Sequence, residues 1–434
     1  MAPPQSFDKG AELDTLHRSA SNSDDTHMSR LASPPITSLA ALSFDERVGN
    51  ALQSNIQEGD PLGGRYPRGA SYLLPKSGDG GETQDYGRQG HEGGKHVEQV
   101  LRAGELGEHC YAFSDGMRAI AAATTAATKL SGNEQPTVLL HRSVYGGTHR
   151  FFSEEHQEKH ISLETIDLTD PNVGEEIRRR KPTLIVGEPV TNPLLDVIDL
   201  KPAMEAARDV GATMILDNTL TTGRACVPLQ IAREVGYDKL LDVLSLTKAY
   251  TAGTLSGAVV TDNAELAKLL FEDRRRKGGA LPADSAASVL EGFKDMDARL
   301  ERMVQTTMTV LEYLSINPVD GIEVLHPFVA RGRQRELAHR YLVNCPAVFT
   351  LRCHLPDDRY QSLLNGLSTV FLRANSFNGH YPMMSESSTQ SHASVKDAQA
   401  KKDAGVEGGI IRLSAGSVFA PKTLLNKVRS IFGA

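Results

Sequence analysis

The sequence predicts an α/β protein built on a mostly parallel central sheet with helices on both faces. Near-continuous apolar segments at 137–141, 183–189 and 212–219 alternate with helical patterns. Strands buried on both faces lack a polar side, and parallel neighbours need helical crossovers between them. The second observation is that polar residues stand at the ends of these apolar segments and of those that follow them. Ligands of parallel sheets bind beyond the carboxyl ends of the strands, which is where these residues would lie. These residues are Asn192, Asp217, Thr219, Ser245, Thr247 and Lys248.

The individual elements follow from local patterns. The segment VEQVLRAGELGE (97–108) has amphipathic spacing, and the alanine-rich stretch 119–127 predicts a packed helix. Residues 201–211 predict a helix that Gly211 ends, since glycine adopts the left-handed cap conformation without strain. Apolar runs at 240–247 and 256–262 predict two more strands.

The last third of the chain predicts a smaller α+β domain. Helical patterns cover 283–314, and strands are expected at 347–354 and 409–416. We divide the chain into a flexible tail (1–45), an N-terminal arm (46–100), a large domain (101–300) and a C-terminal domain (301–434). The arm includes the glycine-rich segment 59–94, a length of loop that is either disordered or functional.

Composition excludes several classes of function. The chain has 434 residues, and 47 basic against 54 acidic residues give a net charge of −7, which argues against a nucleic acid partner. No apolar run approaches the roughly 18–20 residues of a membrane span. The four cysteines form no C-x-x-C pair, which disfavours zinc or a disulfide framework, and the dispersed histidines have no metal-ligand spacing. The first residues resemble neither a signal nor a transit peptide, so we expect a cytoplasmic protein.

Lys248 and Asp217 are candidates for chemistry. A lysine at the mouth of a buried site can lose its proton and form a Schiff base with an aldehyde cofactor. Asp217 ends a strand one crossover earlier, and a carboxylate beside a pyridine nitrogen keeps that nitrogen protonated. Taken alone, Lys248 is more typical of a surface lysine that ends a strand, and Asp217 is more typical of a turn residue or a helix cap.

A phosphate site is expected near the start of the alanine-rich helix. Ser114, Asp115, Gly116 and Met117 precede it, and free N–H groups at a helix start bind anions. Hydroxyl groups of Ser245 and Thr247 could reach the same phosphate. An ordinary capped helix is the alternative.

Seven segments in order give the chain a resemblance to a known family. They are YGRQG, FSDGMRAI, VYGGTHRFF, GEPVTNPLLDVIDL, LDNTLTTG, SLTKAY and GGIIRLSAG. From about 86 to 416 the chain resembles the Cys/Met-metabolism enzymes that depend on pyridoxal 5′-phosphate (PLP), such as cystathionine γ-synthases, cystathionine lyases, methionine γ-lyases and O-acylhomoserine sulfhydrylases. The resemblance implies the fold type I of PLP enzymes and PLP as cofactor.

The resemblance also implies roles at matching positions. Lys248 is similar to the lysine that binds PLP and moves protons on the substrate, Asp217 to the partner of the pyridine nitrogen, and Tyr145 to the stacking tyrosine. Further matches to cofactor-binding positions are Gly116, Met117, Ser245 and Thr247 at the phosphate, Asn192 near the 3′ oxygen, and Thr219 beside Asp217. Arg412 matches the arginine that binds the substrate α-carboxylate, and Ser376 a serine that contacts the lysine or the substrate.

Tyr86 and Arg88 match a pair that reaches the phosphate of a neighbouring subunit. The resemblance therefore implies that the arm contacts this neighbour, with shared active sites in a homodimer within a homotetramer. The basic run 274–277 stays outside the site and is expected to be a solvated helix end.

Several segments depart from the family pattern around the substrate side. The family's Asn-Pro-Thr is missing from YGRQGHEGG, and KAYTAGTLSG is shorter than the family's segment after the lysine. In SFNGHYPMMSESSTQSH, Tyr381 or a residue near it replaces the Glu of the Glu-Ser pair that usually follows Ser-x-Gly-Gly in the family. The N-terminal tail is also longer than usual. These departures leave the cofactor positions intact and the substrate open.

The resemblance implies γ-replacement or β/γ-elimination on a cystathionine- or O-acylhomoserine-like amino acid. Gly147 stands where methionine γ-lyases often carry a cysteine, so that lyase is disfavoured. One alternative is an aminotransferase or decarboxylase of the same broad fold. The other is a catalytically altered paralogue, which the intact set of Lys248, Asp217 and Arg412 disfavours. The expected partners are a small amino acid and other copies of the chain, with no nucleic acid and no membrane.

Overall fold

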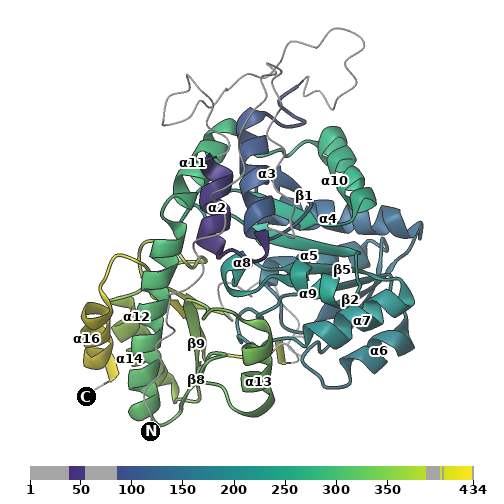
Figure 1. Cartoon of the computed structure of the whole chain (residues 1–434). Helices are drawn as coiled ribbons and strands as arrows, with labels where there is room; N and C mark the ends of the chain where they lie inside the picture. The colour runs from purple at the N-terminus through teal and green to yellow at the C-terminus, as the bar shows by residue number, and fades with distance from the viewer. Residues whose placement is uncertain (1–38, 54–85, 388–400, 403–404, 433–434) are drawn as a thin grey trace. The chain divides into compact units, whose positions relative to one another are not determined.

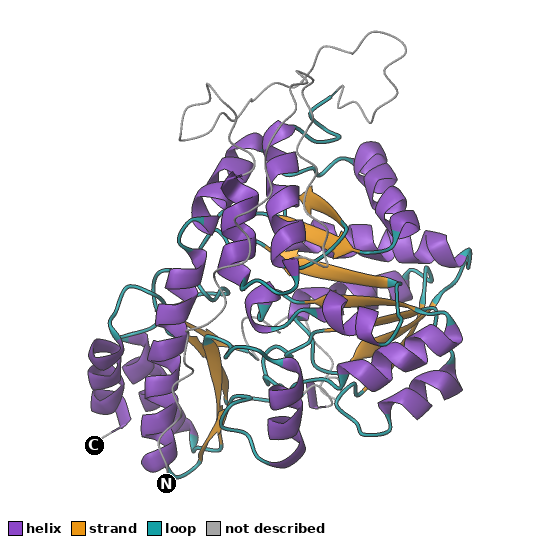
Figure 2. Ribbon diagram, in the orientation of Figure 1, coloured by secondary structure: helices purple, strands orange, loops and turns teal. Residues whose placement is uncertain are grey.

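The structure is a computed structural model that describes residues 39–53, 86–387, 401–402 and 405–432. The described residues belong to one compact unit, Pro35–Ala434. Two sheets with surrounding helices make up this part of the chain (Figures 1 and 2). Most of the expected tail and most of the glycine-rich segment 59–94 lie outside the described residues.

The larger sheet has seven strands in the order β1-β7-β6-β5-β4-β2-β3. β6, β5, β4, β2 and β3 run parallel, whereas β7 is antiparallel to both β6 and β1. The sheet is therefore mostly parallel, as the sequence predicts. Its strands are β1 (His109–Phe113), β2 (Thr137–His141), β3 (Ser162–Ile166), β4 (Leu184–Gly187), β5 (Thr213–Asp217), β6 (Leu240–Ser245) and β7 (Gly257–Thr261).

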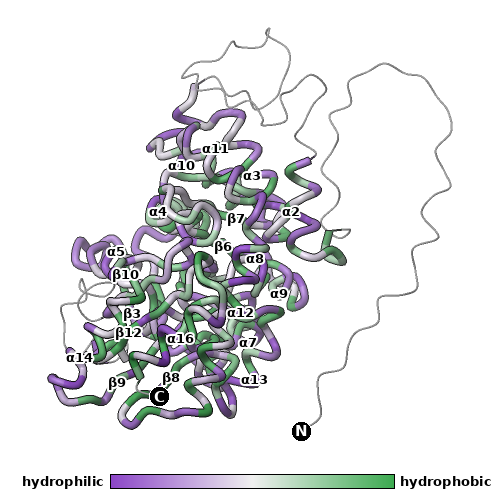
Figure 3. Tube along the Cα trace, turned by 90° about the vertical axis from the view of Figure 1, so that its left-hand side faces the viewer, coloured by the Kyte–Doolittle hydropathy of each residue, from purple (hydrophilic) through white to green (hydrophobic). Residues whose placement is uncertain are grey.

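Both faces of this sheet are buried, which explains the unbroken apolar runs. Along β2, Leu139 belongs to one core cluster, while Val138 and Leu140 belong to the other. The first cluster includes residues of α3, α6, α7 and α9, and the second includes residues of α4, α5 and α10. Figure 3 shows green, hydrophobic segments near the strands β6 and β7 of this sheet.

The predicted helices are present in the structure, but some of them begin or end at other residues than predicted. Gly211 caps α7 with φ of 74°, as predicted. α3 starts at Glu92, before the predicted 97, because the ring of His91 accepts a hydrogen bond from Gly94 N at 3.1 Å and caps the helix. The helices of the large sheet are α2 (Phe44–Gln53), α3 (Glu92–Gly104), α4 (Gly116–Ser131), α5 (Gly146–Gln157), α6 (Val173–Arg180), α7 (Leu200–Val210), α8 (Thr222–Ala225), α9 (Pro228–Glu234), α10 (Ala264–Lys277) and α11 (Ala283–Phe293).

The smaller sheet has five strands in the order β10-β11-β12-β9-β8 and follows the long helix α12 (Met296–Ile316). Its core joins α12, β9, β12, α14 and α16. These elements are β8 (Ile322–Leu325), α13 (Gly332–Tyr341), β9 (Val348–Cys353), α14 (Asp357–Ser368), β10 (Leu372–Arg373), β11 (Met383–Glu386), β12 (Ile410–Ser414) and α16 (Pro421–Phe432).

The prediction for the basic run 274–277 is wrong in one respect. The run does end a helix, α10, but Arg274 is only 3% exposed. Its guanidinium forms an ion pair with Glu98 of α3 at 2.5 Å and donates to the carbonyl of Ala112 at 3.1 Å. Arg274 therefore joins α10 to α3 and β1, a long-range partnership that a local charge pattern does not reveal.

In the part of the chain that the structure describes, no helix is long and apolar enough to cross a membrane.

Candidate active site

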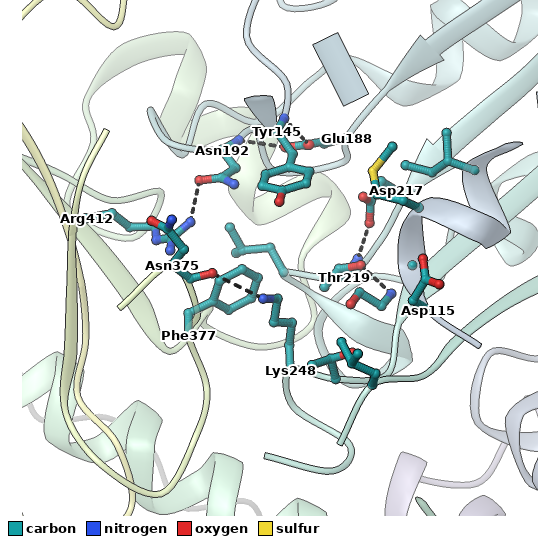
Figure 4. A pocket seen from close by; sticks show the side chains of 17 residues that line it. Asp115, Tyr145, Glu188, Asn192, Asp217, Thr219, Lys248, Asn375, Phe377 and Arg412 are labelled. Atoms are coloured by element: carbon teal, nitrogen blue, oxygen red, sulfur yellow. Dashed lines mark hydrogen bonds between the residues drawn. The ribbon is translucent and has the colours of Figure 1, made fainter. Parts of the chain in front are cut away.

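A cavity of about 300 Å³ lies where strands of the large sheet end, beside the smaller sheet (Figure 4). Most of the site residues predicted from the sequence line it. They are Gly116, Met117, Tyr145, Asn192, Asp217, Thr219, Ser245, Thr247, Lys248 and Arg412. The structure therefore brings together residues that are up to about 300 positions apart in the chain.

Lys248 lies in the turn after β6, and its amine faces the smaller sheet. Nζ donates to Ser376 Oγ at 3.2 Å and to the carbonyl of Asn375 at 3.4 Å. Burial, followed by the nearby charge of Arg412, lowers the pKa of Lys248 to about 8. A substantial fraction of this amine is thus neutral near physiological pH and can act as a nucleophile or base.

Asp217 ends β5 and is held by the residue two positions on. Its Oδ1 accepts a hydrogen bond from Thr219 N at 3.1 Å. Burial raises the pKa of Asp217, while the bonds to Thr219 and the charge of Lys248 lower it. Thr219 Oγ1 accepts a hydrogen bond from Ser245 N at 2.7 Å and so joins the ends of β5 and β6. A half-buried carboxylate of this kind is well suited to a cationic partner in the cavity.

Arg412 enters the cavity from β12 of the smaller sheet and is almost fully buried. Its Nη1 donates to Asn192 Oδ1 at 2.9 Å and its Nη2 to the carbonyl of Ser376 at 3.0 Å. The guanidinium also lies 4.9 Å from the ring centroid of Phe377. Burial lowers the pKa of Arg412 to about 10. These contacts fix the plane of the guanidinium, which suits two-point binding of a carboxylate.

Glu188 is a pocket residue that our sequence analysis missed. It follows β4, is 4% exposed, and accepts hydrogen bonds from the backbone N–H groups of Tyr145 and Asn192, both at 2.7 Å. Burial and the charge of Asp217 raise the pKa of Glu188, and the two N–H bonds oppose this. One carboxylate therefore fixes the main chain at two predicted site residues. The available signal was its place at the end of an apolar strand, like Asp217.

The remaining lining residues are Asp115, which belongs to the predicted helix start, and several residues that the sequence did not single out. Phe377 lies beside both cations, with Lys248 Nζ 5.5 Å from its ring centroid. The other residues not singled out by the sequence are Ile120, Leu220, Leu255 and Asn375.

The start of α4 forms one end of the cavity. Asp115 caps the helix by accepting a hydrogen bond from Arg118 N at 2.8 Å. A Cβ at Gly116 would lie 2.8 Å from Ser245 Cβ, so only glycine allows the helix start and the end of β6 to meet this closely. Unpaired N–H groups of the first helical turn and the hydroxyl of Ser245 thus adjoin one another, as an anion site requires.

These groups fit PLP. The cavity offers an amine of lowered pKa for its aldehyde, a helix start for its phosphate and a half-buried carboxylate, Asp217, for its pyridine nitrogen. Tyr145, 36% exposed, gives the cavity an aromatic face. Among the residues with described positions, no group of three or more His, Cys, Asp or Glu is arranged to hold a metal ion.

Three predicted residues are absent from the cavity lining. Ser376 lies just behind the lining and contacts Lys248 directly. Tyr86 is 46% exposed, and Arg88 stacks over its ring at 5.6 Å and donates to the carbonyl of Arg275 at 2.6 Å. Tyr86 and Arg88 therefore do not reach the cavity of their own chain.

Comparisons with known proteins agree with this geometry. The chain is 30% identical to cystathionine beta-lyase MetC of Bacillus subtilis over 76% of its length and 82% of that protein. It is 28% identical to cystathionine gamma-synthase of Mycobacterium tuberculosis over 82% of its length and 89% of that protein. The fold also matches a crystal structure of cystathionine gamma synthase from Xanthomonas oryzae pv. oryzae in complex with aminoacrylate and cysteine. The two structures superpose with a TM-score of 0.80 at 26% sequence identity, and the match covers 90% of this chain and 98% of the other.

Residues 69–418 match the family profile described as Cys/Met metabolism PLP-dependent enzyme. With this match over most of its length, and with a cavity whose groups fit the cofactor, the chain belongs to the Cys/Met-metabolism family of PLP-dependent enzymes.

Proposed function

We propose that this enzyme acts on a cystathionine- or O-acylhomoserine-like amino acid, by β/γ-elimination or by γ-replacement. The observation that carries the proposal is the convergence of Lys248, Asp217 and Arg412 on one cavity. Ser376 links two of them, since its hydroxyl contacts Lys248 Nζ and its carbonyl accepts from Arg412. Relatives named for cystathionine synthesis and cleavage support the substrate class.

The residues that would hold PLP divide by the part they bind. Lys248 would carry it covalently, and Asp217 would pair with its pyridine nitrogen while Tyr145 covers its ring. The phosphate would bind to the start of α4 and the end of β6, through Gly116, Met117, Ser245 and Thr247. Thr219 would hold the end of β6 in place, and Asn192 would lie near the 3′ oxygen of the cofactor. When bound, PLP supplies the electron sink that makes the Cα–H bond of an amino acid acidic.

The chain's own residues then account for binding and proton transfer. Arg412 would bind the α-carboxylate, because Asn192 and the Ser376 carbonyl already orient its guanidinium. Lys248 Nζ, with a pKa of about 8, would take the Cα proton and return it to the product. The Tyr145 hydroxyl would assist proton transfer to the leaving group, and Phe377 would keep water from the reacting carbons.

We further propose that the enzyme is a homodimer within a homotetramer with shared sites. Tyr86 and Arg88, which lie outside their own cavity, would reach the phosphate in a neighbouring copy. The division at 45, 100 and 300 into tail, arm, large domain and C-terminal domain belongs to this proposal, the arm being the segment that contacts the neighbour. A cytoplasmic location is supported by the four cysteines, all free and buried.

The first test is the visible absorbance of the purified enzyme, which Lys248→Ala should abolish or shift. A panel of cystathionine, cysteine, methionine and O-acylhomoserines, each with and without a thiol, then separates the reactions. A keto acid with ammonia indicates elimination, and a new amino acid formed only with thiol indicates replacement. A keto acid formed only with an amino acceptor would refute both in favour of transamination.

A further inference from the structure

We propose that Glu105, a residue outside the cavity, is a positioning residue for Lys248 and Asp217 together. Its single carboxylate bonds to the chain segments that follow both of them. The inference rests on the assignment of Lys248 and Asp217 to PLP proposed above.

Glu105 lies immediately after α3 and is completely buried. Its Oε1 accepts a hydrogen bond from the Tyr250 hydroxyl at 2.5 Å, and its Oε2 accepts from Asn218 Nδ2 at 3.4 Å. Tyr250 stands two residues after Lys248, and Asn218 is the residue next to Asp217. One carboxylate thus ties together the turns that present the candidate lysine and the candidate aspartate.

The Tyr250 segment has little freedom to move away from Glu105. The Tyr250 ring is fully buried and packs edge-on against Phe293, with centroids 5.4 Å apart. Arg299 of α12 donates to the carbonyls of Ala249 at 3.1 Å and Tyr250 at 3.4 Å. The phenol, held on these sides, transmits the position of Glu105 to the turn that carries Lys248.

The Asn218 segment is held as firmly. Asn218 N donates to the carbonyl of Val243 at 2.9 Å, and Nδ2 also donates to the carbonyl of Cys226 at 3.1 Å. Its Oδ1 accepts a hydrogen bond from the Thr221 hydroxyl. Both N–H bonds of the Asn218 side chain are therefore used, and the orientation of this amide depends on Glu105 as one of its partners.

The surroundings of Glu105 leave no room for a looser arrangement. A Cβ at Gly223 would lie 2.7 Å from Glu105 Oε2, so the α8 backbone approaches the carboxylate closely. Arg47 of α2 supplies a nearby positive charge and caps the end of α3 through the carbonyls of Ala103 at 3.0 Å and Gly104 at 2.9 Å. Burial of a carboxylate is costly, and here its partners are segments adjoining the cofactor residues, which points to a role in placing them.

The test compares Tyr250→Phe and Glu105→Gln with a matched control, Tyr341→Phe. Tyr341 is also buried and donates to a carboxylate at the same distance of 2.5 Å, to Asp199, but it lies on α13 away from the cavity lining. Each variant is measured for resistance of the apo-protein to urea, for PLP affinity, and for the pH dependence of the absorbance of the bound cofactor.

We expect all three variants to lose some stability, because each loses a buried hydrogen bond. Only Tyr250→Phe and Glu105→Gln should weaken PLP binding, by about tenfold, and shift the pH midpoint of the absorbance, since the loss of a buried hydrogen-bond partner beside Lys248 and Asp217 costs about that much. If both bind PLP as the wild type does and keep its midpoint, Glu105 is merely structural and the inference is wrong. Lys248→Ala, tested alongside, separates this failure from that of the proposed site: unchanged absorbance there would refute the site itself.

Discussion

Replacing Gly116 by alanine should weaken PLP binding without unfolding the protein. The new Cβ would lie 2.8 Å from Ser245 Cβ and 3.1 Å from its Oγ, whereas ordinary contacts begin at 3.4 Å. The start of α4 and the end of β6 must therefore separate by about 0.6 Å, the difference between 3.4 and 2.8 Å. Overpacking of this kind costs about 1–3 kcal/mol. If the cofactor phosphate needs both elements in place, its affinity falls by about 5- to 150-fold.

The assay is a titration of apo-protein with PLP, followed by visible absorbance, together with urea unfolding of the apo-protein. Gly49→Ala is the matched control, because Gly49 lies in α2 and a Cβ there meets nothing within 4 Å. This control should keep its PLP affinity and gain up to about 1 kcal/mol from helix propensity. A Gly116→Ala protein with wild-type affinity and unchanged stability would refute the reasoning that the close approach of Gly116 and Ser245 forms the phosphate site.

Three other predictions concern the charged groups of the site. The pKa of Lys248 is lowered from 10.5 to about 8, so the neutral amine becomes more abundant as the pH rises through 8. The rate at which the apo-protein binds PLP should therefore increase over this range and then level off. A rate that still rises at about pH 10 would contradict this prediction. Arg412→Lys should raise KM for amino acid substrates by about 10- to 100-fold while PLP affinity stays constant, because the two-point contact of the guanidinium with the substrate carboxylate is lost. Steady-state kinetics and PLP titration measure the two quantities, and an unchanged KM would count against carboxylate binding by Arg412. Glu188→Gln should lower the free energy of unfolding, measured in urea, by about 1–3 kcal/mol, since one of two backbone N–H groups loses its acceptor. Glu176→Gln, which removes a carboxylate paired with Arg179 and Arg180 at the surface, should change this free energy little, and equal losses in the two variants would refute the special place of Glu188.

The strands of the sheet interior were predictable because burial on both faces leaves a simple pattern. Residues 137–141 form β2 as expected, and Gly211 ends α7. The edge strand β3 was not predicted from the sequence, because the exposed residue Glu164 interrupts its apolar run. The same holds for β1 (109–113), in which histidine and tyrosine alternate with buried residues.

The site divides in a similar way. Lys248 and Asp217 follow apolar strands, so local sequence singles them out, and the family resemblance adds their roles. Glu188 has the same position in its strand, but its importance comes from bonds to the backbone of Tyr145 and Asn192, which only the folded chain creates. Long-range partners of this kind have no local pattern.

The two sheets contribute different chemistry to the cavity. The groups suited to PLP belong to the large sheet, whereas Arg412 and the 375–377 segment belong to the smaller one. Under the proposed roles, the handling of the cofactor and the choice of substrate would be encoded in separate parts of the chain. Substitutions in the smaller sheet would then alter which amino acid is accepted without disturbing Lys248 or Asp217, and an ancestral reaction would diversify at one wall of the cavity while its chemistry is preserved at the other.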